Sequence, residues 1–179
     1  NRQNRMNRTE AKEMGETGQL RSLDDALALL PHKDPFVFVD EIVYLEPGVK
    51  AVGIKRVRPD EFWVPGHFPD RPTMPGVLIM EAMAQVGAVA LLAKDVDGVR
   101  KNPKESAKGR RLLPLFAGVD KARFRRPVRP GDSLALETEL LGTWGNFGRA
   151  RSIAQLTDGS PVAEAELMFA LGDLDGGDL

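Results

Sequence analysis

A stretch of about sixteen mostly apolar residues, 77–92, constrains the fold of this chain more than any other feature. Glu81 and Gln85 are its two polar side chains. The stretch is short for a membrane span and a carboxylate interrupts it, so we interpret it as a core helix. A helix that is apolar on nearly every face is buried on nearly every face. The rest of the chain must therefore supply a sheet that covers it.

Segments rich in β-branched and alternating residues lie on both sides of this helix. Residues 36–45 and 49–57, separated by turn residues, predict a β-hairpin. Further strands are predicted within residues 115–128, 132–144, 149–156 and 161–171. In the last of them Ala163, Ala165, Leu167 and Phe169 share one face. We expect an α+β fold in which a mainly antiparallel sheet covers the long helix.

Three segments have no hydrophobic period. Residues 1–19 are polar with mixed charges and no apolar signal region, so we expect a disordered segment or a tag remnant. Residues 94–113 predict a basic surface loop, and residues 172–179 an acidic, loose tail. One domain then spans residues 20–171, a length that suits a single core.

The composition argues against several kinds of site. The chain has no cysteine, which excludes disulfides and thiolate sites and fits a reducing compartment, so we expect a cytoplasmic protein. Its two histidines, His32 and His67, do not form a metal-binding pattern, and we expect no metal. A net charge of −1 gives no reason to expect a nucleic-acid or membrane partner.

The segment PGHFPDRPTMPGVLIMEAMAQ, residues 65–85, brings three chemical groups close together in sequence. Pro75 and Gly76 predict the start of the helix, where the N–H groups of Gly76 and Val77 point out of a partly positive end. His67 precedes that start, and Glu81 lies about one and a half turns inside the helix. A base, an acid and an oxyanion-stabilising N–H are what elimination next to a carbonyl requires. The residues alone leave a structural histidine as an alternative.

The environment of Glu81 is the unusual part of this segment. Its helical neighbours are apolar, and only Gln85, four residues further on, shares its face. An unpaired buried carboxylate is costly. Glu81 is therefore expected to be neutral with a raised pKa, to be hydrogen-bonded, or to line a polar pocket. For His32 we expect a structural hydrogen-bonding role.

Four motifs, LPHKDPFVFVD (30–40), GHFPDRPTMPGVLIMEAMAQ (66–85), RFRRPVRPGD (123–132) and VAEAELMFA (162–170), resemble the FabZ-type 3-hydroxyacyl-[acyl carrier protein] dehydratases of type II fatty acid synthesis. The resemblance covers residues 20–171 in consistent order. It implies the hot-dog fold, an antiparallel sheet wrapped around a central helix. It also implies dehydration of (3R)-3-hydroxyacyl-[acyl carrier protein] to the trans-2-enoyl thioester, without a cofactor.

The resemblance assigns roles to particular residues. It implies that His67 and Glu81 are catalytic and meet across a homodimer interface, with three dimers commonly forming a hexamer. We expect His67 to take the C2 proton and the Gly76 amide to hold the thioester oxygen. Glu81 is expected to protonate the leaving hydroxyl, directly or through a water. The residues expected to contact the substrate are Gly76, Val77, Gln85, Phe68 and Phe116.

Basic residues are concentrated ahead of the last strands. Residues 99–129 contain eleven Lys or Arg against two acidic residues. We interpret this bias as a docking surface for the acidic acyl carrier protein, formed by Lys121, Arg123, Arg125, Arg126 and Arg129, the first three alternating along one strand face. A solvated face is the alternative, and nucleic-acid binding is less supported.

Two other functions stay open at this point. A hot-dog acyl thioesterase has the same fold, although such enzymes generally lack the G-H-F-P motif, and a shared fold does not imply shared chemistry. A non-catalytic module that binds acyl groups or acyl carrier protein is the second alternative. The related dehydratase-isomerases usually have aspartate where Glu81 stands.

Overall fold

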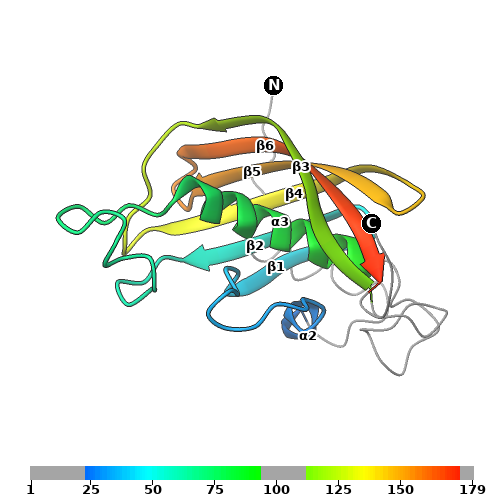
Figure 1. The fold of residues 1–179 in the computed structure, drawn as a ribbon, viewed down its shortest axis with the longest axis horizontal. Helices are drawn as coiled ribbons and strands as arrows, with labels where there is room; N and C mark the ends of the chain where they lie inside the picture. Colours follow the sequence, from blue (N-terminus) through cyan, green and yellow to red (C-terminus); the bar gives the residue numbers. More distant parts are fainter. Residues whose placement is uncertain (1–22, 94–111, 174–179) are drawn as a thin grey trace.

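The computed structural model describes residues 23–93 and 112–173. The N-terminal segment 1–19, residues 94–111 of the basic loop and residues 174–179 of the tail, all predicted above to be irregular, lie outside this range. The described elements are α2 (Asp24–Leu27), β1 (Glu41–Glu46), β2 (Lys50–Arg56), α3 (Gly76–Ala93), β3 (Leu112–Phe124), β4 (Ser133–Trp144), β5 (Phe147–Leu156) and β6 (Pro161–Asp173) (Figure 1).

The strands form one antiparallel sheet that covers the long helix. Its strand order is β1-β2-β4-β5-β6-β3, so β1 and β3 are the edge strands. Helix α3 lies along one face of this sheet (Figure 1). Fourteen of its eighteen residues are buried. Both the α+β class and the central position of the apolar helix are therefore confirmed.

Helix α3 begins at the predicted position, and its burial explains its composition. The carbonyl of Pro75 accepts the first helical bond, from the Leu78 amide at 2.9 Å. Within the described residues this is the one helix long and apolar enough to cross a membrane, yet 78% of it is buried inside the fold. Its unburied residues are those of the first turn, residues 76–78, and Glu81.

Some strand boundaries differ from the sequence prediction. Strand β1 begins at Glu41, five residues later than expected, because the backbone before it bonds to α3: the Phe38 amide donates to Gln85 Oε1 at 2.8 Å. Strand β3 already begins at Leu112, inside the predicted basic loop, and β6 runs to Asp173, inside the predicted tail. The inward face of β6 is as predicted, with Leu167 and Phe169 each 1% exposed.

Candidate active site

His67 lies in a loop that is folded back on itself just before α3. Its Nδ1 lies 2.6 Å from the carbonyl oxygen of Thr73, its amide donates to the carbonyl of Trp63 at 2.9 Å, and its own carbonyl accepts from the Thr73 amide at 2.8 Å. A carbonyl can only accept, so Nδ1 carries the proton. The Nε2 lone pair of the neutral ring is then left as a base.

Glu81 is held by two donors that meet on one oxygen. His32 Nε2 lies 3.2 Å and Gln85 Nε2 lies 3.0 Å from Glu81 Oε1. Burial raises the pKa of Glu81, but the hydrogen bonds from His32 and Gln85 and the charge of His32 outweigh it and leave the pKa below its ordinary value. Of the three states expected from sequence, the structure has the hydrogen-bonded one, and the raised pKa is wrong for the single chain.

Gln85 is almost completely buried, at 1% exposure. Its amide nitrogen donates to the carbonyl of Phe36 at 2.8 Å as well as to Glu81, and its oxygen accepts from the Phe38 amide. Both polar atoms of this side chain are thus occupied within the chain. Gln85 fastens the segment before β1 to α3, a function that sequence reasoning did not find.

The start of α3 is lined by exposed apolar groups. The first amides of a helix have no partner within it, so the N–H groups of Gly76 and Val77 can bind an anionic oxygen. Val77 is 72% exposed and Phe68 56%. The ring of Phe124 lies against Gly76, where an added Cβ would come within 2.8 Å of it. Phe116 lies on β3, with its ring 6.2 Å from that of the buried Phe169.

The single chain gives His67 and Glu81 separate partners. His67 bonds to the Thr73 carbonyl of its own loop, whereas Glu81 bonds to His32 and Gln85. Oxygen Oε2 of Glu81 accepts no hydrogen bond from the described residues. The side chain of Glu81 keeps 21% of its surface exposed.

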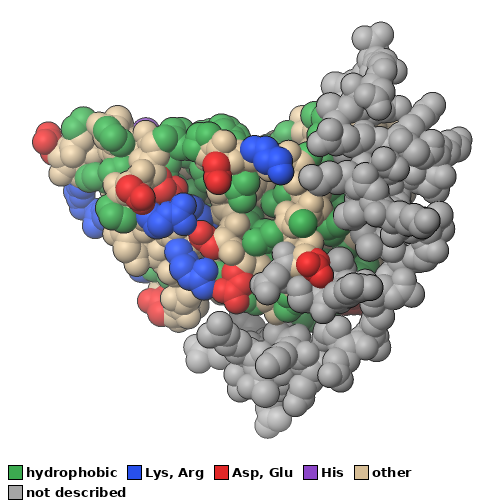
Figure 2. Space-filling model, turned by 90° about the horizontal axis from the view of Figure 1, so that it is seen from below, with side chains coloured by type: hydrophobic (Ala, Val, Ile, Leu, Met, Phe, Trp, Pro, Cys, Tyr) green, Lys and Arg blue, Asp and Glu red, His purple; other side chains and the backbone are tan. Residues whose placement is uncertain are grey.

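The predicted basic residues differ in how free their charges are. Lys121 pairs with Glu166 at 2.7 Å, and Arg125 pairs with Glu164. The regular alternation predicted for Lys121, Arg123 and Arg125 is wrong: β3 bulges between Asp120 and Arg123, and it ends before Arg125. A bulge interrupts the alternation of side chains. On the face in Figure 2, basic and acidic side chains lie among hydrophobic ones.

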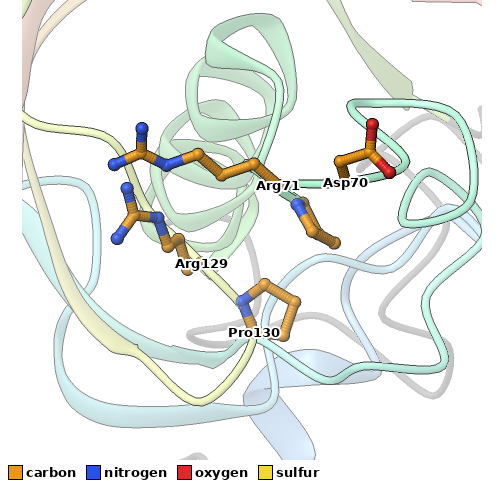
Figure 3. Close-up of a pocket in the computed structure, with 5 residues that line it drawn as sticks. Asp70, Arg71, Arg129 and Pro130 are labelled. Carbon is orange, nitrogen blue, oxygen red and sulfur yellow. The ribbon is translucent and has the colours of Figure 1, made fainter.

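Arg129 has a neighbour that the sequence prediction missed. Together with Arg71 it lines an open pocket of about 380 Å³, whose other lining residues are Asp70, Pro72 and Pro130. Figure 3 shows the two guanidinium groups side by side, with the Asp70 carboxylate on the other side of the pocket. Neither guanidinium forms an ion pair with a described carboxylate. Two adjacent unpaired cations favour an anionic partner.

No group of three or more His, Cys, Asp or Glu side chains that could hold a metal ion occurs in residues 23–93 and 112–173. The groups of the candidate site are the imidazole of His67, the carboxylate of Glu81 and the backbone amides at the start of α3. These groups are suited to moving protons and stabilising an oxyanion.

Comparison with known proteins adds the family. Residues 30–166 match the model of the FabA-like domain. The chain is 48% identical over 150 residues to the 3-hydroxyacyl-[acyl-carrier-protein] dehydratase FabZ of Caldicellulosiruptor bescii, covering 84% of this chain and 98% of that protein. It is 48% identical over 146 residues to the protein of the same name from Geobacillus thermodenitrificans, covering 82% and 92%.

Solved structures of the same fold include proteins described as a dehydratase and as a hypothetical thioesterase. The dehydratase heterocomplex ApeI:P from Xenorhabdus doucetiae aligns with a TM-score of 0.66 at 18% identity, covering 83% of this chain and 91% of that one. A hypothetical thioesterase with coenzyme A from Streptococcus pneumoniae aligns at 0.57 with 9% identity, covering 85% and 98%. At these identities the likeness establishes the hot-dog fold, and the chemistry has to be argued from the site.

Proposed function

This chain belongs to the family of FabA-like domains, and we propose that His67 and Glu81 are the catalytic pair with which it dehydrates its substrate. The enzyme is a 3-hydroxyacyl-[acyl-carrier-protein] dehydratase of fatty acid biosynthesis, as its 48 to 50% identity to FabZ proteins over most of the chain indicates. It removes water from the 3-hydroxyacyl thioester and leaves the 2-enoyl thioester. We also propose that the enzyme is located in the cytoplasm.

The observation that carries the catalytic assignment is the contact between His67 Nδ1 and the Thr73 carbonyl. It fixes the tautomer, so Nε2 is the basic nitrogen, and it fixes the orientation of the ring. A neutral imidazole placed beside a thioester can remove the proton from C2.

The charge that develops on the thioester oxygen needs donors. The amides of Gly76 and Val77, at the start of the eighteen-residue helix α3, are unpaired within the helix and lie at its partly positive end. Glycine at position 76 has no side chain where the Phe124 ring packs, since an added Cβ would lie 2.8 Å from that ring. We assign the thioester oxygen to the Gly76 amide.

The hydroxyl group leaves as water only if it receives a proton. Glu81 Oε2 is the free oxygen of a fixed, partly exposed carboxyl group, and we assign this step to it. The pKa of Glu81 lies below its ordinary value in the single chain, which by itself disfavours the acid form. Exclusion of water by a bound acyl chain opposes this, because further desolvation favours the neutral carboxyl.

The catalytic pair is proposed to be completed by a second copy of the chain. Strand β3 is an edge strand, paired only with β6, and it bears the exposed side chains of Phe116, Val119 and Phe124. The start of α3 adds Val77 and Phe68 to the exposed apolar surface. An unpaired edge bearing exposed apolar groups is suited to association. A two-fold dimer there presents the same surface twice, and a trimer of such dimers is the proposed larger assembly.

Mixed dimers test the catalytic pair and its sharing together. His67→Ala and Glu81→Gln are each expected to lower kcat by at least about 100-fold. When differently tagged copies of the two variants are co-expressed, random pairing is expected to restore about a quarter of wild-type activity, because half of the dimers each contain one intact site.

The assay follows enoyl absorbance with a 3-hydroxyacyl-[acyl carrier protein] substrate, and a thiol reagent in a parallel sample detects thioester hydrolysis. Co-expressed copies that both contain His67→Ala are the control. If purified mixed dimers stay as inactive as this control, the two residues do not act across subunits. If either single variant keeps near-normal turnover, the catalytic assignment is wrong.

The acidic carrier protein is proposed to dock on the basic residues around the loop of His67. Because Lys121 and Arg125 have carboxylate partners within the chain, the basic side chains that pair with no described carboxylate are more important for docking. These are Arg129 and Arg71, with Arg123 and Arg126 nearby in sequence. Unpaired charges at a rim steer an oppositely charged partner and orient it.

A further inference from the structure

We propose that His32 is a positioning residue for Glu81, holding Oε1 so that Oε2 presents the proton to the leaving hydroxyl. The observation behind it is the 3.2 Å contact between His32 Nε2 and Glu81 Oε1. The inference rests on the proposed role of Glu81 as the acid, and it gives His32 more than the structural role expected from sequence.

The segment that bears His32 is fixed against α3. Leu30, two residues before His32, is 3% exposed, and Phe38 is 1% exposed. Between Phe36 and Phe38 the backbone is bonded on both sides to the Gln85 amide, at 2.8 Å each. The imidazole is thus carried by an anchored segment, which limits how far it can move relative to Glu81.

Two donors on one carboxyl oxygen determine where an added proton goes. His32 and Gln85 both point to Oε1, whereas Oε2 is free of bonds to the described residues. Protonating Oε1 would force at least one donor away, so the proton of the acid form resides on Oε2. In the forward reaction Oε2–H gives this proton to the hydroxyl, the C3–O bond breaks, and His67 holds the proton from C2. Solvent then reprotonates Oε2 and takes the proton from His67.

His32 also lowers the pKa of Glu81. The hydrogen bond from His32 lowers the pKa of Glu81 more than the charge of His32 does, and burial raises it. Among the described residues the other hydrogen-bond partner of the Glu81 carboxyl group is Gln85, which does not titrate. The sequence neighbours of His32, Lys33 and Asp34, are exposed. Removing His32 therefore raises the pKa of Glu81.

The imidazole of His32 has a polar atom that the fold leaves unused. Its Nδ1 is buried without a hydrogen-bond partner among the described residues. Orienting the ring through Nδ1 is therefore not how the segment is held, since the Gln85 bonds do that. Glu81 is the partner of this side chain, which favours a role in setting the carboxyl group over a role in folding the segment.

Three variants test the proposal by pH–rate profiles with a carrier-bound substrate. His32→Ala is expected to lower kcat by about 10- to 100-fold, the value of one hydrogen bond to a charged group, with KM changed less than about twofold. Activity requires protonated Glu81 and is lost above the pKa of Glu81. Because removing His32 raises this pKa, the high-pH limb of the pH–rate profile of His32→Ala is expected to move to higher pH. His32→Gln keeps an N–H donor, so its kcat and the pH of its high-pH limb are expected to lie close to those of the wild type. Lys33→Ala, on the same segment, is the matched control.

The outcomes separate this inference from the proposed function. An inactive Glu81→Gln variant supports the role of Glu81. If His32→Ala then has wild-type kcat, or a reduced kcat with an unshifted high-pH limb, the role of His32 is overturned while that of Glu81 stands. If Glu81→Gln is active, the proposed function fails first. If His32→Ala does not fold, the His32→Gln variant tests the proposal alone. If folded His32→Gln loses as much kcat as is expected for His32→Ala, positioning of Glu81 through an N–H donor is contradicted.

Discussion

Gly87 is a residue at which α3 lies close against the sheet. A Cβ built there would lie 2.9 Å from both the Phe169 ring and the Thr138 methyl group. Both neighbours are fully enclosed, with Thr138 at 0% and Phe169 at 1% exposure. The hydroxyl of Thr138 is fixed as well, donating to the Met83 carbonyl at 2.9 Å. Moving either neighbour away would disturb the enclosed core, so glycine at 87 allows this close packing of helix and sheet.

Gly87→Ala is therefore expected to destabilise the protein. Replacing glycine within a helix gains about 1 kcal/mol from helix propensity, but overpacking a rigid core costs about 1–3 kcal/mol, so the net change is a loss. Urea unfolding monitored by circular dichroism measures it. Gly118→Ala on β3, where the nearest atom is at an ordinary 3.7 Å, is the control and should leave the free energy of unfolding nearly unchanged. Equal stability of both variants would show that the helix can shift.

At the scale of elements, the loop between β2 and α3 depends on a buried ion pair. Lys55 on β2 is 1% exposed, and its Nζ lies 2.8 Å from Glu61 Oε1. Glu61 also accepts from the Arg58 amide at 2.8 Å and from Trp63 Nε1 at 3.0 Å. The carbonyl of Trp63 in turn accepts the His67 amide. One carboxylate thus links the core of the sheet to the loop of His67.

Glu61→Gln is expected to cost about 3–5 kcal/mol, because it leaves the buried Lys55 charge without its partner. Burial raises the pKa of Glu61, but its bonds to Lys55, Arg58 and Trp63 hold it below the ordinary 4.5. The stability from this group is therefore fully present above pH 4.5 and is lost as the pH falls through the lower value in the folded state.

Urea unfolding of wild type and Glu61→Gln from pH 7 to pH 3 measures this difference, which should narrow in acid. Asp60→Asn removes the neighbouring, exposed carboxylate and serves as the control. A difference that stays constant down to pH 3 would contradict the assigned ionisation of Glu61.

At the scale of the whole molecule, the charges are nearly balanced, with 25 basic and 26 acidic residues in the chain. Most described basic side chains outside the Arg71 and Arg129 pair lie near a carboxylate, as Lys50 does with Glu137 at 2.7 Å. The two guanidinium groups in Figure 3, which pair with no described carboxylate, are therefore among the exceptions on a surface of mixed charge. Such an exception can orient an acidic carrier protein without giving the enzyme a general affinity for polyanions.

The double variant Arg71→Glu with Arg129→Glu is expected to discriminate against the carrier-bound substrate. The ratio of kcat/KM for the carrier-bound substrate to that for a small thioester without the protein should fall by about tenfold, and the effect should shrink at high salt. Lys121→Ala, whose charge is already paired with Glu166, should change the ratio much less. If Lys121→Ala lowered the ratio as much as the double variant does, the pocket of Arg71 and Arg129 would not be part of the docking surface.

The sequence by itself determined the elements and the identity of the site segment. The apolar run, the Pro75-Gly76 start and the alternation in residues 161–171 depend on local periodicity and backbone chemistry, which do not need the rest of the chain. The same local information placed His67 before the helix and Glu81 inside it. Strand ends were less accurate, as β1 shows, because the backbone of residues 36–38 bonds to Gln85, 47 positions after Phe38.

Only the tertiary structure decided which side chains meet. The contacts of His32 with Glu81 and of Lys55 with Glu61, and the shared pocket of Arg71 and Arg129, join different elements or loops, and no spacing within the sequence encodes them. The ionisation of Glu81 follows from such a contact, which is why the sequence left three states open and the fold selected one. Periodicity fixes how each segment buries its apolar face, whereas packing fixes the neighbours, and the chemistry of a site depends on neighbours.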